Sequence, residues 1–128
     1  MVPLSALVAR WNAVSQVPVF VGTVPEGTST PYASLNVIQS NPVRLSSNVV
    51  AFTESILSFK AVADKLTDAK AIGEAGKQAF NNGPDGWGQV GASVLDMSFM
   101  NEAFDYSPQP TLTGNRPWMA IQEYRLRS

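Results

Sequence analysis

Side chains able to carry out catalysis are scarce in this sequence, whose 128 residues include no Cys and no His. Thiolate and imidazole chemistry, and zinc sites of the usual ligand types, are therefore excluded. A Ser or Thr nucleophile would need a Lys as its base, but no Ser-x-x-Lys sequence occurs. Acid–base catalysis by two carboxylates stays open, with Asp96 and Glu102 as the candidate pair, because spatial pairing is not visible in a sequence. We expect no catalytic residue.

Carboxylates gather at two places where they could bind a hard cation. Asp64 and Asp68 are spaced i, i+4, and further acids follow one predicted strand and its exit at Asp96, Glu102 and Asp105. The sequence has no Asp-x-Asp-x-Asp-Gly calcium loop. The first pair also flanks a predicted helix N-terminus, where the helix dipole favours acids for electrostatic reasons alone. We predict no metal site.

A glycine-rich segment, residues 86–91, reads Gly-Trp-Gly-Gln-Val-Gly and matches the G-x-G-x-x-G pattern of dinucleotide-binding proteins. That pattern requires a strand before it and a helix after it, because the helix N-terminus holds the pyrophosphate. Here a predicted helix precedes the glycines and a strand pattern follows them. We therefore predict a loop and no cofactor.

Three arginines and one tryptophan are candidates for contacts between subunits. Arg125 and Arg127 alternate on one face of the last predicted strand, with Arg116 in the preceding loop, and could pair with carboxylates of another subunit or with phosphates. A solvated strand end is the alternative. Trp87 lies in the glycine-rich loop and is either a local lid or an interface anchor, whereas Trp11 belongs to the core by its helical phase.

Hydrophobic periodicity predicts seven elements that must position these side chains. They are a helix over 3–14, strands over 17–21, 32–38 and 53–63, a helix over 69–80, and strands over 95–99 and 118–126. The run over 53–63 is the predicted central strand, and a loop is expected over 40–48. Thr67 is the expected N-cap of the second helix, with Asp68 in its first turn. Gly73 and Gly76 on the inner face of this helix predict a close approach to the sheet, because each costs about 1 kcal/mol relative to Ala.

The order α-β-β-β-α-β-β predicts a single α+β domain over 1–128. Two antiparallel pairs flank a strand–helix–strand crossover, which gives a mixed, mainly antiparallel sheet with both helices on one face. The other face is only partly covered. Its polar residues are expected to be solvated (Ser34, Asn36, Ser58, Lys60, Asp96 and Ser98), while three apolar residues remain to meet a neighbour (Ile56, Val62 and Met119).

Composition excludes several broad classes of protein. The chain is 45% hydrophobic and 15% charged with a formal net charge of −1, which argues against general disorder and against a protein whose main task is to neutralise nucleic-acid phosphates. No stretch approaches the ~20 apolar residues of a membrane-spanning helix, and the N-terminal segment lacks the features of a signal peptide. We expect a cytosolic or assembled soluble protein with no membrane partner.

The chain resembles the tail terminator, or tail completion, proteins of long-tailed bacteriophages. The resemblance covers nearly the whole chain and rests on an N-terminal helix, the loop and strand start over 24–32, the long strand over 53–63 before a small-residue helix over 69–80, and the closing segment over 116–127. It rests on element order and short strings, without a catalytic signature.

This resemblance implies a virion structural protein that forms a ring, a hexamer by analogy, at the head-proximal end of the tail. The ring would end growth of the tail tube, offer a docking surface to the head-completion or connector protein, and leave a lumen through which DNA passes. Assembly would take place in the host cytoplasm. The partners would be contacted by four loops, over 22–31, 40–50, 81–92 and 107–117. The first of these includes Glu26. Two alternatives are another head–tail connector component and a small ligand-binding domain with Trp87 as its lid.

Overall fold

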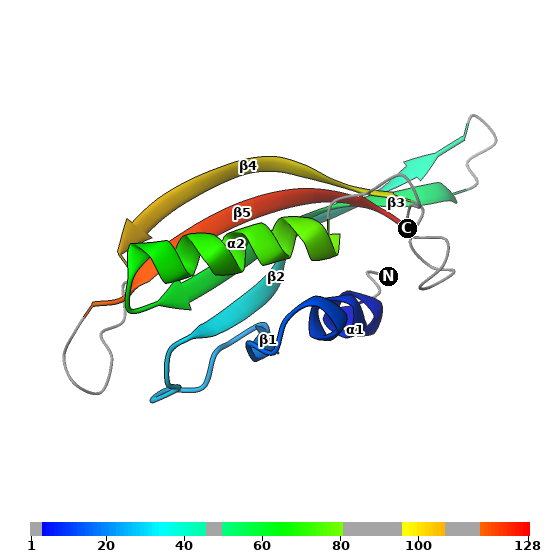
Figure 1. Cartoon of the computed structure of the whole chain (residues 1–128). Coiled ribbons are helices and arrows are strands. Elements are labelled where there is room, and N and C mark those ends of the chain that lie inside the picture. Colours follow the sequence, from blue (N-terminus) through cyan, green and yellow to red (C-terminus); the bar gives the residue numbers. More distant parts are fainter. Residues whose placement is uncertain (1–3, 46–49, 81–95, 107–115) are drawn as a thin grey trace.

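A computed structural model of the protein describes residues 4–45, 50–80, 96–106 and 116–128. It contains two helices and a five-stranded sheet (Figure 1). In chain order the elements are α1 (Leu4–Val14), β1 (Val19–Val21), β2 (Tyr32–Arg44), β3 (Val50–Ala63), α2 (Leu66–Phe80), β4 (Asp96–Tyr106) and β5 (Trp118–Arg127). The predicted α+β class and element order are confirmed. No helix in the described part of the chain is long and apolar enough to span a bilayer.

The strands are arranged in the order β1-β2-β3-β5-β4, which places β3 at the centre as predicted. β2 and β3 are antiparallel, as are β4 and β5, and β5 is also antiparallel to β3. β3 and β4 are therefore parallel, with α2 crossing between them and β5 inserted in the gap. β1 joins the sheet parallel to β2 through only three residue pairs, a pairing that the sequence did not predict.

The β2–β3 hairpin is longer than predicted, and the expected loop over 40–48 is wrong for its first part. β2 stays paired with β3 as far as Arg44, which lies opposite Val50, although the register shifts between Val37 and Gln39 and again between Val43 and Arg44. Pro42 lies opposite Thr53 inside this ladder. β1 ends its pairing with β2 at Leu35, so the following part of β2 is an edge strand. Proline is tolerated on such an edge because the backbone N–H that it lacks has no neighbouring strand to bond. β4 likewise extends well beyond the predicted 95–99.

Both helices cover the same face of the sheet and enclose one core. α1 contributes Leu7 and Trp11, both fully buried, and the Trp11 indole donates a hydrogen bond to the Val17 carbonyl over 2.7 Å. Arg10 donates to the carbonyl of Ala79 at the C-terminal end of α2, which satisfies an acceptor that has no partner within the helix. The predicted core position of Trp11 is confirmed, while Val14 at the end of the predicted apolar stripe is 41% exposed.

Helix α2 packs on the centre of the sheet through the small residues that the sequence singled out. A Cβ at Gly73 would lie 3.0 Å from the Gln122 amide nitrogen, and one at Gly76 would lie 2.8 Å from the Phe59 ring. The predicted close approach is confirmed. The predicted N-cap is wrong, since the helix begins at Leu66 and Thr67 lies within its first turn.

Candidate functional site

The acidic residues of β4 that were considered as a catalytic or metal-binding group, Asp96, Glu102 and Asp105, are not brought together. Along β5, Asp96 pairs with Arg127 and Glu102 pairs with Gln122, which separates the two acidic positions by about 17 Å at the usual strand rise. Asp105 pairs with Met119, further along the same strand. Among the described residues, no three acidic groups lie close enough to hold a metal ion. The candidate pair Asp96 and Glu102 therefore has no shared cleft in which to act.

Glu102 instead belongs to a buried polar network beneath α2. The Gln122 amide donates hydrogen bonds to the Gly73 carbonyl over 2.7 Å and to Glu102 Oε2 over 2.6 Å, and accepts one from the Tyr124 hydroxyl over 2.6 Å. Burial raises the pKa of Tyr124 well above its ordinary value, and the charge of Glu102 adds to the effect, so the phenol stays a donor. Each of these side chains is hydrogen-bonded to another residue of the network, so the network serves to join α2 to the sheet.

Lys77 closes the solvent side of this network. Its ammonium lies 3.1 Å from Glu74 and 3.3 Å from Glu102, and 4.9 Å from the centroid of the Phe99 ring. Hydrogen bonding to Glu74, followed by that to Glu102, raises the pKa of Lys77 and keeps it charged. The lysine therefore neutralises a carboxylate that β4 directs toward the helix, and it is engaged rather than available as a catalytic base.

Two of the three predicted interface arginines, Arg125 and Arg127, meet on the face of the sheet opposite the helices, here called the outer face. Nε of Arg125 lies 3.7 Å from one carboxylate oxygen of Glu54, and Nε of Arg127 lies 3.7 Å from the other. The Arg127 guanidinium also lies 5.6 Å from the Phe52 ring centroid. The three charged side chains are 36–45% exposed, so these contacts contribute about 0–1 kcal/mol each. The cluster joins β3 to β5 within the chain and keeps an exposed, net positive surface.

The other end of the outer face is more covered than the sequence indicated. Val62 and Met119, expected to meet a neighbour, are 3% and 8% exposed because they pack with Tyr32 in a second small core. Phe20 and Val24 complete it from β1 and the segment that follows. Ser34 and Ser58, expected to be solvated, are buried as well. The expectation of an apolar assembly surface at Val62 and Met119 is therefore wrong, since the chain itself covers these residues.

The remaining predicted interface residues are spread over the molecule. Arg116 is exposed and immediately precedes Pro117 and β5, so it lies at the opposite end of that strand from Arg125 and Arg127. Glu26 is exposed in the segment between β1 and β2. Trp87 and the glycine-rich segment over 86–91 lie outside the described residues. The structure thus brings Arg125 and Arg127 together and places Arg116 elsewhere.

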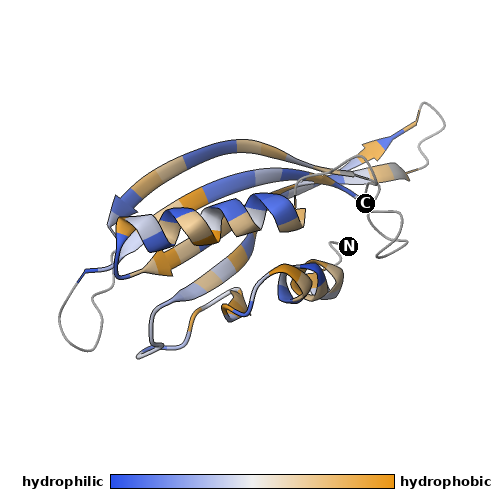
Figure 2. Cartoon of the chain, viewed as in Figure 1, coloured by the Kyte–Doolittle hydropathy of each residue, from blue (hydrophilic) through white to orange (hydrophobic). Residues whose placement is uncertain are grey.

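The end of the β2–β3 hairpin falls within the segment 40–50 that the sequence predicts as a partner-contacting loop, but its described residues form a paired ribbon. β5 pairs with β3 only from Glu54 onward, and Ser128 adds two backbone hydrogen bonds to Thr53. Residues 42–45 and 50–53 therefore project as a two-stranded ribbon, here called the hairpin arm, which is visible beyond the body and carries hydrophobic colouring near its end (Figures 1 and 2). Three of its apolar side chains are strongly exposed: Val43 36%, Leu45 56% and Val50 45%.

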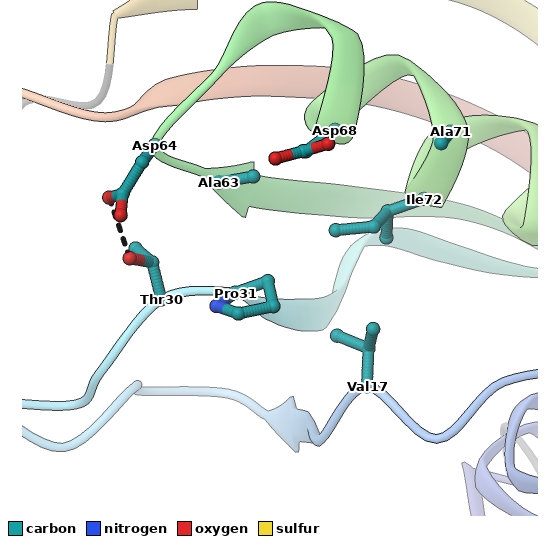
Figure 3. Close-up of a pocket in the computed structure, with 8 residues that line it drawn as sticks. All are labelled: Val17, Thr30, Pro31, Ala63, Asp64, Asp68, Ala71 and Ile72. Carbon is teal, nitrogen blue, oxygen red and sulfur yellow. Dashed lines mark hydrogen bonds between the residues drawn. The ribbon is translucent and has the colours of Figure 1, made fainter.

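A cavity of about 270 Å³ lies between the start of α2 and the segment leading into β2 (Figure 3). Its wall is mainly apolar, formed by Val17, Pro31, Ala63, Ala71 and Ile72, while Thr30, Asp64 and Asp68 supply the polar lining. The Thr30 hydroxyl donates a hydrogen bond to Asp64 over 2.7 Å. Its volume is close to the lower end of the roughly 300–1,000 Å³ found for sites of drug-sized ligands, and it has room for one or two side chains.

No known protein family matches the chain, and no curated protein does so either. Among solved structures, the chain is similar to a protein in the structure described as "Virion of native gene transfer agent (GTA) particle". The two share 15% sequence identity with a TM-score of 0.61, and the alignment covers 98% of this chain and 95% of the other. A likeness at this identity shows a common fold extending over essentially the full length of both chains.

Proposed function

We propose that the protein is a structural component of a tailed phage-like particle and that it acts as a tail terminator, forming a ring at the head-proximal end of the tail. The observation that carries this proposal is the fold shared with a virion protein over 98% of the chain. The surface chemistry supports it. The described residues present exposed apolar and charged side chains on the hairpin arm and on the outer face, while the partly buried carboxylate of Glu102 is held by Gln122 and Lys77.

A ring terminates a polymer by a simple physical means. Head-to-tail contacts between identical subunits close into a cycle when the rotation between neighbours is an integral fraction of a turn, and no free end then remains. One side of the ring binds the last layer of tube subunits and removes the surface on which the next layer would assemble. The opposite side differs chemically and is free to bind the head-completion protein, while the central opening admits DNA.

Deletion of the gene from a particle-producing strain tests this function, with electron microscopy of the products as the readout. A tail terminator predicts tails of uncontrolled length without heads, because nothing stops addition of tube subunits. A head–tail connector predicts tails of normal length that fail to join heads. Particles of normal form in the deletion strain would contradict both structural roles.

A further inference from the structure

We propose that the hairpin arm of one copy seats in the cavity beside α2 of the next copy, with Leu45 entering the apolar wall and Arg44 facing Asp64 and Asp68. This inference rests on the proposed ring and names the contact that would build it. The occupant is a second copy of this chain because both complementary surfaces belong to the same chain.

The first argument is that the arm lacks sufficient support from its own chain. Two-stranded hairpins are marginally stable in water, and the arm extends beyond the last pair of β3 with β5, with the two Thr53–Ser128 backbone hydrogen bonds at its root. Leu45 and Val50 are about half exposed there, and neither belongs to the two hydrophobic clusters found among the described residues. An apolar ribbon in this position is stabilised by a partner that covers these side chains.

The second argument is that the arm and cavity complement each other in charge and polarity. Within residues 42–45 and 50–53, Arg44 is the charged residue and there is no acid. The cavity lining contains two carboxylates, no cation and a mainly apolar wall. In Figure 3, Asp64, Ala63 and Asp68 lie along one edge of the cavity, across from Pro31 and Val17. A side chain that enters the cavity therefore meets apolar atoms, while a cation beside it can meet the acids.

The third argument concerns geometry. The arm contains the start of β3 and the cavity lies at its end, and a strand of 14 residues is about 45 Å long. The arm of a subunit therefore cannot fill its own cavity. Complementary surfaces at opposite ends of one subunit produce a heterologous, head-to-tail contact, which is the type that closes into rings.

The test is a cysteine pair, for which the chain is well suited because it contains no native Cys. Leu45→Cys and Ala71→Cys alter two exposed side chains, one on the arm and one in the cavity lining. The double variant should form disulfides between copies under mild oxidation, because a disulfide requires Cα atoms within about 7 Å. The single variants and a Leu45→Cys, Asp105→Cys pair serve as matched controls. Absence of pair-specific cross-links in a series reaching about 1 mM, where a contact with millimolar Kd is half formed, overturns the inference.

Charge exchange provides an independent measurement that does not depend on disulfide chemistry. Arg44→Glu and Asp68→Lys should each raise the concentration needed for assembly about tenfold, and the two together should restore assembly. Lys70→Glu and Asp105→Lys are the matched charge controls, and thermal unfolding checks that each variant folds. A double variant that assembles no better than the single ones contradicts the contact.

These outcomes separate the contact from the proposed function. Pair-specific cross-links that stop at one discrete mass support both the arm-to-cavity contact and the closed ring. An open-ended cross-linked ladder supports the contact and contradicts ring closure. A discrete oligomer by light scattering without pair-specific cross-links supports the ring and overturns this contact.

Discussion

Replacement of Gln122 by Leu should lower the free energy of unfolding by about 2–4 kcal/mol, although the side chain keeps nearly the same volume. Gln122 is fully buried, and its amide joins the Gly73 carbonyl, Glu102 and Tyr124. Its orientation is fixed because the nitrogen faces two acceptors, whereas the opposite rotamer would place an oxygen against them. A leucine side chain at this position would be an apolar group surrounded by polar groups that it cannot hydrogen-bond.

The magnitude follows from what the substitution leaves unpaired. The Tyr124 hydroxyl loses its acceptor in a fully buried position, which costs about 1–3 kcal/mol. Glu102 loses a hydrogen bond to a charged acceptor, worth about 1.5–3 kcal/mol, but its 15% exposure lets water replace part of it. The Gly73 carbonyl lies inside α2 and keeps its place in the helical hydrogen-bond ladder.

Urea unfolding followed by circular dichroism measures this effect, and a double-mutant cycle with Tyr124→Phe isolates its cause. The single Tyr124→Phe variant should lose about 1 kcal/mol. The same change in the Gln122→Leu background should cost nothing or stabilise, because it removes the unpaired hydroxyl. Effects that add within about 0.3 kcal/mol would refute the reasoning, since coupling is what a shared hydrogen bond predicts.

Three further perturbations test the described contacts. Gly76→Ala should lower stability by about 1 kcal/mol, because overpacking against the ring beneath the helix outweighs a gain in helix propensity; an unchanged or higher Tm would contradict this. Reversal of both Arg125 and Arg127 to Glu should change monomer stability by less than about 1 kcal/mol yet reduce oligomer mass in light scattering. Adding Glu54→Arg to that variant restores opposite charges within the chain. Recovery of the oligomer would then show that the arginines act through their contact with residue 54 of the same subunit. Because burial raises the pKa of Tyr124, the native state keeps a proton that the unfolded state loses above about pH 10. The free energy of unfolding should therefore fall above that pH by up to about 1.4 kcal/mol per pH unit, and less steeply in the Tyr124→Phe variant. Equal slopes in the two proteins would exclude this tyrosine as the cause.

The sequence predicted the elements that bury a periodic apolar face. Leu57, Phe59 and Ala61 alternate along β3, and all three are fully buried, because alternation is a direct consequence of one strand face meeting the core. The inner face of α2 was predicted correctly for the same reason. Small residues such as Gly76 also indicated close packing, but the sequence did not reveal that the amide of Gln122 occupies the space they leave.

Features outside the core were less predictable, since no burial pattern marks them. The last residues of β2, including Pro42, carry turn-forming signals but are held in the ladder by backbone hydrogen bonds to β3. The outer face shows the same difficulty: Val62 and Met119 read as an uncovered surface because the residues that cover them lie 38 or more positions away along the chain, at Phe20 and Val24. Long-range coverage depends on the path of a segment, which local periodicity does not encode.

The charged cluster on the outer face and the hairpin arm form one structural unit at the same end of the sheet. Glu54 is the first residue of β3 that pairs with β5, and Arg127 is its partner in that pairing. The arm begins at this point, and the guanidinium of Arg127 lies over Phe52 within it. Arg125 and Arg127 thus hold the root of the ribbon together with Ser128, whose backbone bonds to Thr53. If the arm joins subunits, loss of these arginines weakens assembly by releasing the ribbon, so their effect on the oligomer requires no direct contact between them and the neighbouring subunit.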